Sequence, residues 1–567
     1  MMNKETANLI EQHFDTAFAA PDGGAKLREL ILTLAMQGRL VEQYPNDSPA
    51  SELLKEIETA KQRLVKAGKI KKPKALPPIK TEEVPYKLPQ GWKWVRLGTV
   101  AEVNGGFAFK SSKYSNDGVR VIRISDFDES GFKNDKIVRY PYSDNLSIFS
   151  LEANNLLMAM TGGTVGKSLL VKSLPEQMVV NQRVATIKMA TGVVPEFING
   201  LIQTDLIQAV IQKAKNSTND NISMGDITGF FVPLPPLPEQ HRIVARIDQL
   251  MARCDALEKL RKEREEKRLA VHAAAIRELL NASDDSAWHF IGQHFGQLYT
   301  VKENVAELRK AILQLAVMGR LVPQDPNDPP ASELLKEIQA EKQRLIKEKK
   351  IKKPKPVPSI SQADEPFPIP DNWLWVRIIE LAESIDYGTS QKTCDDSSLI
   401  PVYRMGNIIN GQLIDEGFKY IAPDTDELPR LFLQPNDILF NRTNSYELVG
   451  KSARYTGPVE HATFASYLIR VRLFDALLTP VFISQAMNAP YFRSTQIEPE
   501  IVQQCGQANF NGTKLSLCFV PLPPLSEQHR IVARIDQLMA LCDALEQQID
   551  AASGKQAALL NAVMAQV

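Results

Sequence analysis

FVPLPPLPEQHRIVARIDQLMARCDALE, residues 231–258, occurs twice in this chain. It returns at residues 519–546 as FVPLPPLSEQHRIVARIDQLMALCDALE, and the two copies differ only at Pro238/Ser526 and Arg253/Leu541. An internal repeat this close indicates one structural unit that the chain uses twice. The repeat therefore divides the sequence before any other motif is considered.

Each copy of the repeat predicts a long helix. Two prolines, Pro235 and Pro236, stiffen the chain before the first helix, and apolar residues then recur at alternating steps of four and three, which is typical of a coiled-coil seam. The first helix is expected over residues 240–280, on the order of 60 Å at 1.5 Å per residue. The predicted seam residues are Ile243, Ile247, Leu250, Cys254 and Leu257 in the first copy, and Ile531, Ile535, Leu538, Cys542 and Leu545 in the second.

A second, longer repeat relates residues 10–95 to residues 291–376 at a constant offset of 281. Each copy, called here a helical block, opens with an apolar helical pattern ending at Gly38 or Gly319, where a helix C-cap is expected. A charged helix and a Lys/Pro linker follow. Because the chain begins with a helical block and ends with the repeated helix, we expect the first block to complete the C-terminal helix. That closure predicts a pseudo-two-fold, cyclic molecule with two long antiparallel helices.

The two regions between the repeats have diverged. They contain short β-type runs such as NLLMAM and YLIRVRL, punctuated by Gly, Asn and Asp, which favour mixed α/β domains. Only a few points align: residues 122–124 with 403–405, 165–168 with 449–452, and Asn221 with Asn509. The expected fold class is thus α+β. The expected boundaries are a helical block and linker at 1–83, a variable domain at 84–233, a spacer helix at 234–282, a second block at 283–364, a second variable domain at 365–521 and a second spacer helix at 522–567.

Composition gives no sign of a general attraction to nucleic acid or membrane. The 567 residues are 44% hydrophobic, and 67 Lys and Arg balance 67 Asp and Glu, so any polyanion must bind to local patches. The five cysteines are scattered and form no CxxC pair, which favours reduced thiols without a metal site. The N-terminus has no signal-peptide pattern, and no apolar run approaches 18 residues. These features predict a cytoplasmic protein.

Polar and basic residues gather in the turns between the predicted strands of both variable regions. Arg, Asn and Gln can read guanine and adenine with two hydrogen bonds, and Lys suits phosphate. Individually each is more often an ordinary surface residue; as a set they predict a DNA-binding face. The candidates are Lys110, Ser111, Lys113, Arg123, Thr161, Lys167, Asn181, Gln182, Arg183 and Asn221 in the first region, and Tyr387, Thr389, Ser390, Lys392, Arg404, Asn407, Asn441, Arg442, Asn444, Lys451, Gln507 and Asn509 in the second.

Two other motifs are ambiguous. The GKS tripeptides at 166–168 and 450–452 resemble the end of a P-loop, but Thr161 and Ser445 stand where its first glycine is required, so a turn lysine poised for a phosphate is the better interpretation. The linker lysines are either solvated charges or additional phosphate contacts; they are Lys69, Lys71, Lys72, Lys74, Lys350, Lys352, Lys353 and Lys355.

The repeated PLPPLPEQHRIVARID segment, its copy, LRKAILQLAVMGRLV and the tandem variable regions resemble the specificity (S) subunits of type I restriction-modification enzymes. The resemblance covers nearly the whole chain. It implies two target recognition domains, each binding one half of a split DNA sequence, and helices that form an antiparallel spacer and dock methyltransferase subunits. It also implies a chain that is itself non-catalytic and needs no cofactor. Partner methyltransferase (M) subunits would use S-adenosylmethionine, and partner restriction (R) subunits would use ATP and magnesium.

Divergence of the two variable regions predicts two different half-sites, and hence an asymmetric target. Two other classes of function remain open at this point. One is a tandem scaffold that binds only proteins, which would suit the neutral charge. The other is a stand-alone DNA methyltransferase, for which the sequence contains no complete cofactor motif.

Overall fold

The computed structural model describes residues 14–15, 18, 20, 22–68, 75–215, 221–281, 284–504 and 507–566. The chain divides into two compact units, of which the first holds residues 1–264 and 552–567 and the second holds residues 265–551. Each unit combines helices with several small sheets. The prediction of mixed helix and strand domains is therefore confirmed.

The first unit is built around β-strands that come almost entirely from residues 93–234. Its main sheet has the order β2-β10-β7-β8, and smaller sheets pair β6-β3-β9, β1-β11 and β4-β5. The strands are β1 (Lys93–Arg96), β2 (Ala101–Gly105), β3 (Val119–Ile122), β4 (Phe127–Asp128), β5 (Gly131–Phe132), β6 (Arg139–Tyr140), β7 (Leu156–Ala159), β8 (Ser168–Leu170), β9 (Met178–Val180), β10 (Val184–Met189) and β11 (Phe231–Leu234).

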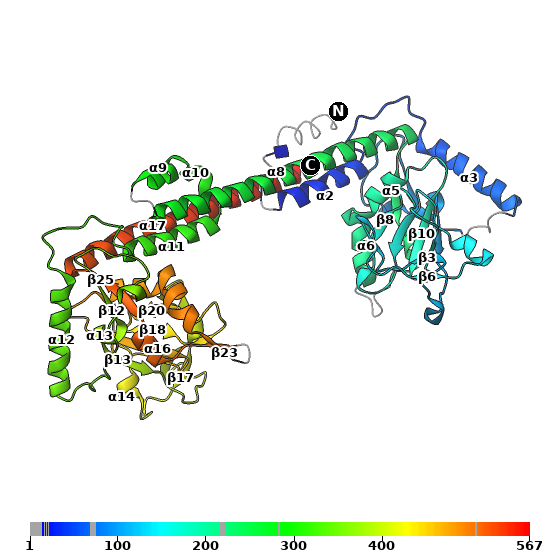
Figure 1. The fold of residues 1–567 in the computed structure, drawn as a ribbon. Coiled ribbons are helices and arrows are strands. Elements are labelled where there is room, and N and C mark those ends of the chain that lie inside the picture. The colour runs from blue at the N-terminus through cyan, green and yellow to red at the C-terminus, as the bar shows by residue number, and fades with distance from the viewer. Residues whose placement is uncertain are drawn as a thin grey trace. The chain divides into compact units, whose positions relative to one another are not determined.

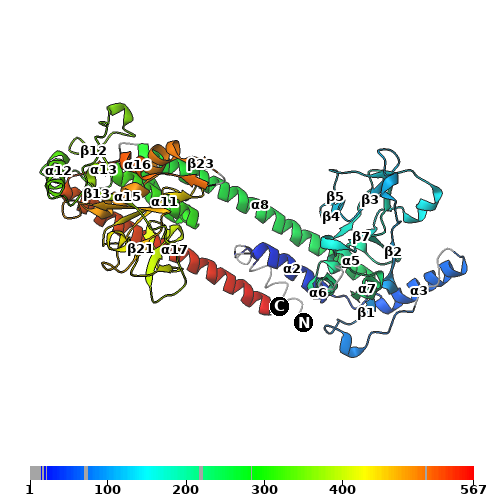
Figure 2. The same cartoon turned by 90° about the horizontal axis from the view of Figure 1, so that it is seen from below.

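Helices cover the main sheet and flank it (Figures 1 and 2). Strand β7 is buried along its whole length, as expected of a central strand whose sequence is a continuous apolar run. The helices are α2 (Gly23–Met36), α3 (Ala50–Lys66), α4 (Leu97–Val100), α5 (Pro195–Ile202), α6 (Asp205–Lys215), α7 (Met224–Gly229), the first part of α8 (Leu237–Asn281) and the end of α17 (Leu525–Gln566), with 3₁₀ turns η1 (Thr81–Glu83), η2 (Ser111–Lys113), η3 (Asp144–Phe149) and η4 (Gly162–Thr164).

The second unit repeats this sheet topology. Its main sheet is β13-β22-β18-β20, beside β17-β14-β21, β12-β25 and β15-β16, and it adds a sheet of order β19-β24-β23. The strands are β12 (Leu374–Arg377), β13 (Ala382–Tyr387), β14 (Ile400–Tyr403), β15 (Ile408–Ile409), β16 (Gln412–Leu413), β17 (Lys419–Ile421), β18 (Ile438–Asn441), β19 (Thr443–Asn444), β20 (Ser452–Arg454), β21 (Thr463–Phe464), β22 (Leu468–Leu473), β23 (Val502–Gln504), β24 (Gln507–Asn509) and β25 (Phe519–Leu522).

The helices of the second unit also follow those of the first, and α12 stands along one side of the sheets (Figure 1). The helices are the remainder of α8, α9 (Ser286–Gln293), α10 (Phe295–Leu298), α11 (Lys302–Val317), α12 (Ala331–Lys347), α13 (Ile378–Leu381), α14 (Leu428–Leu431), α15 (Pro480–Asn488), α16 (Gly512–Leu517) and the first part of α17, with short helical turns η5 (Gln362–Asp364), η6 (Met405–Asn407), η7 (Phe492–Ile497) and η8 (Glu498–Glu500).

The repeated Glu-Gln pair explains why each long helix begins where it does. Glu239 accepts a hydrogen bond from Trp92 Nε1 at 2.9 Å, and Gln240 binds the backbone of Val194 at 2.9 Å and of Pro235 at 3.1 Å. In the second unit Glu527 and Gln528 make the matching bonds, to Trp373, Thr479 and Pro523. Burial raises the pKa of both glutamates. Trp92 and Trp373 therefore tie each variable domain to its long helix.

Each helical block packs on the long helix of its own unit. Helix α2 lies beside α8 (Figures 1 and 2), and Arg28 of α2 forms ion pairs with Asp255 at 2.8 Å and Glu258 at 2.9 Å on α8. Arg309 of α11 makes the equivalent pair with Asp543 of α17 at 2.6 Å. Gly38 and Gly319 follow α2 and α11 with φ of +69° and +68°, so the predicted C-caps are confirmed.

The first helical block meets the C-terminal helix in a more limited way than the sequence predicted. Near the end of α17, Leu560 is fully buried in the core of the first unit, and Lys26 Nζ donates to Asn561 at 3.0 Å. The ion pairs of Arg28 on α2 go instead to Asp255 and Glu258 of α8. Completion of α17 by the first block is therefore confined to its last turns.

Candidate nucleic-acid interface

Backbone hydrogen bonds gather several loops of the first unit at one edge of its sheets. Phe107 N donates to Val180 O at 2.8 Å, Gln182 N donates to Phe107 O at 2.9 Å, and Asn181 N donates to Ile122 O at 2.9 Å. The loop after β2, the turn after β3 and the segment after β9 thus lie side by side. Backbone bonds of this kind fix the loops whatever their side chains are.

A second set of bonds adds two more loops to the same edge. Met160 N donates to Arg183 O at 2.9 Å, and Ile222 N donates to Met160 O at 2.9 Å. Thr161 and Asn221 form a β-bridge. The predicted residues Thr161, Asn181, Gln182, Arg183 and Asn221 are therefore brought together. We call this surface the loop face of the first unit.

The second unit builds its loop face with the same backbone bonds. Arg442 N donates to Tyr467 O at 3.0 Å, and Phe510 N donates to Arg442 O at 2.8 Å. Thr443 pairs with Asn509, so the predicted correspondence of Asn221 with Asn509 is confirmed. The bond from Ala159 N to Lys167 O, at 2.9 Å, recurs between Asn441 N and Lys451 O at 2.8 Å. The alignment of residues 165–168 with 449–452 is therefore also confirmed.

A glycine permits the closest approach in each loop face. A Cβ added at Gly106 would lie 2.1 Å from Val180 O and 2.4 Å from Asn181 O, and one at Gly388 would lie 2.3 Å from Phe464 O and 2.4 Å from Ala465 O. No side chain fits at these distances, so the loop after β2 or β13 reaches its neighbours only because glycine stands there.

In the first unit several predicted side chains are exposed and uncommitted. The exposed cations are Lys110, Lys113, Lys167 and Arg183. None of them makes an ion pair with a residue in the described part of the chain. Ser111, Gln182 and Asn221 are exposed beside them. Asn181 Oδ1 accepts the backbone N–H of Arg183 at 3.1 Å, and Thr161 Oγ1 is buried. A cationic surface with amide groups at its centre is suited to phosphates and base edges.

Arg123 is engaged within the fold, and its contact with DNA stays a prediction. Its Nε and Nη2 donate to the carboxylate of Asp126 at 2.8 and 2.9 Å, and Nη2 also binds Lys136 O at 3.0 Å. The hydrogen bond to Asp126 raises the pKa of Arg123. With its fork occupied in this way, Arg123 shapes the turn after β3.

Two candidates of the second unit are hydrogen-bonded within the fold, and a third is buried. Asn407 is buried, and its Nδ2 donates to Ile414 O at 2.9 Å and Glu416 O at 2.7 Å. Thr389 is buried and donates to Glu427 at 2.7 Å. Asn441 is also buried. Asn407 and Thr389 thus close turns of the fold, as polar turn residues often do, and the contact of these three residues with DNA stays a prediction.

The remaining candidates of the second unit lie at its surface. Ser390, Lys392 and Arg404 are exposed, Lys451 is half-buried, and Arg404 donates to Gly417 O at 2.7 Å. Asn444 Oδ1 accepts the N–H of Ser445 at 2.8 Å, and Asn509 accepts from Thr443 Oγ1 at 2.8 Å. Gln507 pairs with Gln504 through the backbone of β24, and its side chain lies outside the described atoms.

Aromatic residues on the second loop face escaped the sequence prediction. Tyr446 is 37% exposed and Tyr467 is 49% exposed. Arg493 holds the turn that contains Tyr446 in place by donating to Tyr446 O at 2.7 Å and to Val449 O at 2.8 Å. Tyr467 occupies the position that Arg183 has in the first unit. Aligning the two variable regions strand by strand, instead of by residue type, would have identified Tyr467 as a candidate.

The GKS tripeptides are turns between strands. Lys167 comes directly before strand β8 and Lys451 directly before β20, whereas a P-loop lysine opens a helix. Ser168 and Ser452 are buried. The interpretation as turn lysines is therefore favoured over a nucleotide site.

Known proteins share this organisation. The family model for the type I restriction modification DNA specificity domain matches residues 89–266 and 370–552. The chain belongs to this family. The specificity subunits of the type I restriction enzymes EcoAI and EcoEI from Escherichia coli are 33% and 31% identical to it, each over 95% of this chain and 93% of the relative.

A solved structure agrees with the fold of this specificity subunit. A chain from a structural study of the assembly and conformational transition of the type I R-M system has a TM-score of 0.50 at 18% identity, covering 85% of this chain and 98% of that one. Family membership places the chain among the non-catalytic recognition subunits of these enzymes.

The predicted seam residues of the specificity subunit are core residues. Ile243, Leu250 and Cys254 of α8 are buried in the first unit with Ile247, and Leu257 packs at the edge of that core. Ile531, Ile535 and Cys542 of α17 are buried in the second, with Leu538 and Leu545 partly buried against them. Burial raises the pKa of the Cys254 and Cys542 thiols, so these cysteines serve as small apolar residues.

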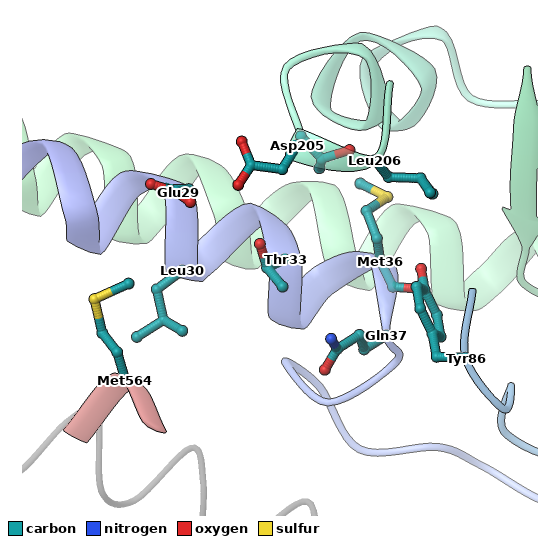
Figure 3. A pocket seen from close by; sticks show the side chains of 10 residues that line it. Glu29, Leu30, Thr33, Met36, Gln37, Tyr86, Asp205, Leu206 and Met564 are labelled. Atoms are coloured by element: carbon teal, nitrogen blue, oxygen red, sulfur yellow. The ribbon is translucent and has the colours of Figure 1, made fainter. Parts of the chain in front are cut away.

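A cavity of about 340 Å³ lies away from the loop face, against α2 and α6 (Figure 3). Glu29 and Asp205 lie near each other in its lining, and a hydrogen bond to Asp205 raises the pKa of Glu29. In the second unit Tyr491 occupies the corresponding space. Its backbone N–H donates to Gln314 at 3.0 Å and its ring contacts Phe367 at 5.2 Å. The two units are therefore packed differently beneath a shared framework.

Among the residues that the structure describes, no cluster of His, Cys, Asp and Glu has the makings of a metal site. Over the same residues, none of the helices of the specificity subunit combines the length and apolar character needed to cross a bilayer. Lys350, Lys352, Lys353 and Lys355 are exposed after α12; the first linker lysines, 69–74, lie outside the described residues.

Proposed function

We propose that this specificity subunit recognises a bipartite, asymmetric DNA site, with one half-site bound by each loop face. The observation that carries the proposal is the substitution of side chains on an unchanged framework. At equivalent backbone positions the exposed Arg183 of the first unit gives way to the exposed Tyr467 of the second, and the buried Met160 gives way to the half-buried Arg442. Two domains with one framework and different surface groups are suited to reading two different sequences.

Phosphate contacts would supply much of the affinity. The uncommitted cations Lys110, Lys113 and Lys167 flank the amide groups of the first loop face, and Lys392 and Arg404 lie on the second. Such contacts bind any sequence and weaken with salt. They explain how a chain with no net charge binds DNA.

The repeated helices are proposed to act as a spacer and a docking surface. Helix α8 has 45 residues and α17 has 42, or about 68 and 63 Å at 1.5 Å per residue. We propose that they run antiparallel as a coiled coil with pseudo-two-fold symmetry, so that the half-sites have opposite orientations. Their near-identical sequences suit two equivalent M subunits.

The chemistry is proposed to belong to the partners. M subunits would methylate adenine with S-adenosylmethionine, and R subunits would translocate and cleave DNA with ATP and magnesium. The specificity subunit itself would bind no cofactor and would act in the cytoplasm, where the DNA lies.

Exchange of one variable region tests this function. The chain is co-expressed with its M subunits, and methylated adenines are mapped across the host genome before and after residues 84–233 are replaced by the matching region of a relative. We expect one half-site to change while the other stays. Unchanged methylation would favour a protein scaffold, and methyl transfer by the isolated chain would establish a stand-alone methyltransferase.

A further inference from the structure

Arg442 occupies the most constrained backbone position on the second loop face. It lies between β18 and β19, its N–H donates to Tyr467 O at 3.0 Å, and its carbonyl accepts from Phe510 N at 2.8 Å. Three separate segments thus meet at this residue. The backbone of Arg442 is therefore fixed on both sides.

The guanidinium of Arg442 is positioned by an aromatic ring. It lies over Tyr387 with 4.9 Å between the guanidinium carbon and the ring centroid, and Nη1 donates to Ser466 O at 3.2 Å. Stacking on an aromatic face orients the planar fork of arginine and is an interaction that lysine reproduces poorly. The fork therefore has a fixed plane before any ligand arrives.

The ring of Tyr387 is itself fixed. Its hydroxyl accepts a hydrogen bond from Gly512 N at 2.7 Å, and a Cβ added at Gly512 would lie 3.1 Å from that oxygen. Tyr387 nevertheless remains 43% exposed. Because the ring is anchored at its tip and open along its edge, it supports Arg442 at the surface.

The charge of Arg442 is not neutralised within the protein. Of the arginines in this domain, Arg470 and Arg472 pair with Asp386 and Asp437 at 2.7 Å, and Arg493 pairs with Glu498 at 3.0 Å. Arg442 makes no ion pair with any described residue. Its Nε is buried and its Nη1 makes one hydrogen bond, to Ser466 O, so Nη1 and Nη2 are the nitrogens open to a ligand. An oriented, uncompensated guanidinium at a DNA-binding face calls for an acceptor from outside.

We infer that Arg442 reads a guanine in the half-site of the second domain and that Tyr387 is its positioning residue. Two nitrogens of the fork would donate to O6 and N7 of the guanine, the pairing that arginine geometry favours in the major groove. The inference rests on the proposed function. It goes further by naming one residue, one base and one half-site. In the first unit Met160 takes the place of Arg442, so the first half-site has no such contact.

The test uses the complete complex with M subunits and compares methylation of a target library in which each base of both half-sites is varied. The main variant is R442M, because the equivalent position of the first unit carries Met160 and the framework accepts it. We expect R442M to lose the preference for guanine at one position of the second half-site by about 10- to 100-fold. Preferences at every other position, including the first half-site, should stay.

Further variants separate base reading from phosphate binding and from structure. R442K keeps the charge but not the fork, so it should also lose discrimination at that position. Y387L should weaken discrimination by about 3- to 10-fold, an order expected for loss of one cation–π contact, and Y387F, which keeps the ring, should restore most of it. K451Q is the control. If Lys451 contacts a phosphate, its loss should lower methylation of all targets alike, because phosphate contacts carry no sequence information.

Equal loss of methylation on every target by R442M and R442K, or a second half-site without a guanine, would overturn the assignment of Arg442. Failure of the proposed function gives a different result: the wild-type complex itself then shows no bipartite methylation.

Discussion

The indole N–H of Trp92 donates to the buried carboxylate of Glu239 at 2.9 Å, which joins the first strand of a recognition domain to the first turn of its long helix. The same relationship ties Trp373 to Glu527 at 2.8 Å in the second unit. Each bond connects a variable domain to the repeated helix. It therefore fixes the position of a domain that has diverged on a helix that has not.

Replacement of Trp92 by Phe should destabilise the first unit by about 1–3 kcal/mol, because a buried acceptor on Glu239 loses its donor. The measurement is the midpoint of thermal unfolding of the full chain, followed by hydrogen exchange in α8. W373F is the matched variant and should shift protection in α17 instead. If W92F and W373F changed the hydrogen-exchange protection of the same peptides, the prediction that each bond stabilises only its own unit would be wrong.

Lys342 provides a pH dependence with a definite sign. Its Nζ donates to Ala382 O at 2.9 Å and to Ile379 O, and burial lowers its pKa from 10.5 to about 8. Between those values the unfolded chain binds more protons than the folded one, so the stability of the second unit should rise from pH 8 to 10.5.

K342M removes this titrating group and should flatten the rise. The quantity to compare is the free energy of unfolding of wild type minus variant at pH 7.5, 9 and 10.5. A difference that does not change with pH, or that shrinks as pH rises, would contradict the prediction.

Alanine at Gly106 should disable one recognition domain and leave the other intact. The new Cβ would lie 2.1 Å from Val180 O, so the loop after β2 must move, at a cost of about 1–3 kcal/mol or more. Methylation mapping should show loss of discrimination in the first half-site only. G388A should give the reverse, and G163A is the control, since nothing lies within 4 Å of its Cβ.

Four residues inserted after Glu263 of α8 should lengthen the unread gap of the target. The insertion adds about 6 Å and is close to one helical turn, so the apolar stripe keeps its direction. At ~3.4 Å per base pair this equals about two base pairs. Mapped sites should keep both half-sites with a longer gap; altered half-sites at the original gap would contradict a spacer role.

Much of the framework was predictable because it is repeated. The helix expected over residues 240–280 spans Leu237–Asn281, and Asn221 and Asn509 do occupy one position. Repetition aligns distant segments without any knowledge of contacts. It was not enough to predict which long helix the first block would join, because α8 and α17 offer Arg28 the same acidic pair, Asp255 with Glu258 or Asp543 with Glu546.

The candidate site was predictable only as a set of loops. Asn407 and Arg404 look alike in sequence as polar turn residues, yet Asn407 is buried with its amide bound to Ile414 and Glu416, whereas Arg404 is exposed. A residue that closes its own turn and one that faces a ligand follow the same local pattern. Only tertiary contacts separate them. The paired contact of Arg442 with Tyr387 joins residues 55 apart in sequence, beyond the reach of any local signal.

The loop faces are held by backbone-to-backbone bonds, from Met160 to Arg183 and from Arg442 to Tyr467. Arg183 and Tyr467 are exposed at one shared position, and replacement of an exposed side chain costs the fold little stability. Under the proposed function, new target preferences would therefore arise by single mutations that never pass through an unfolded intermediate. Each half of the molecule would then drift on its own, and the repertoire of a lineage would grow as the product of its two halves.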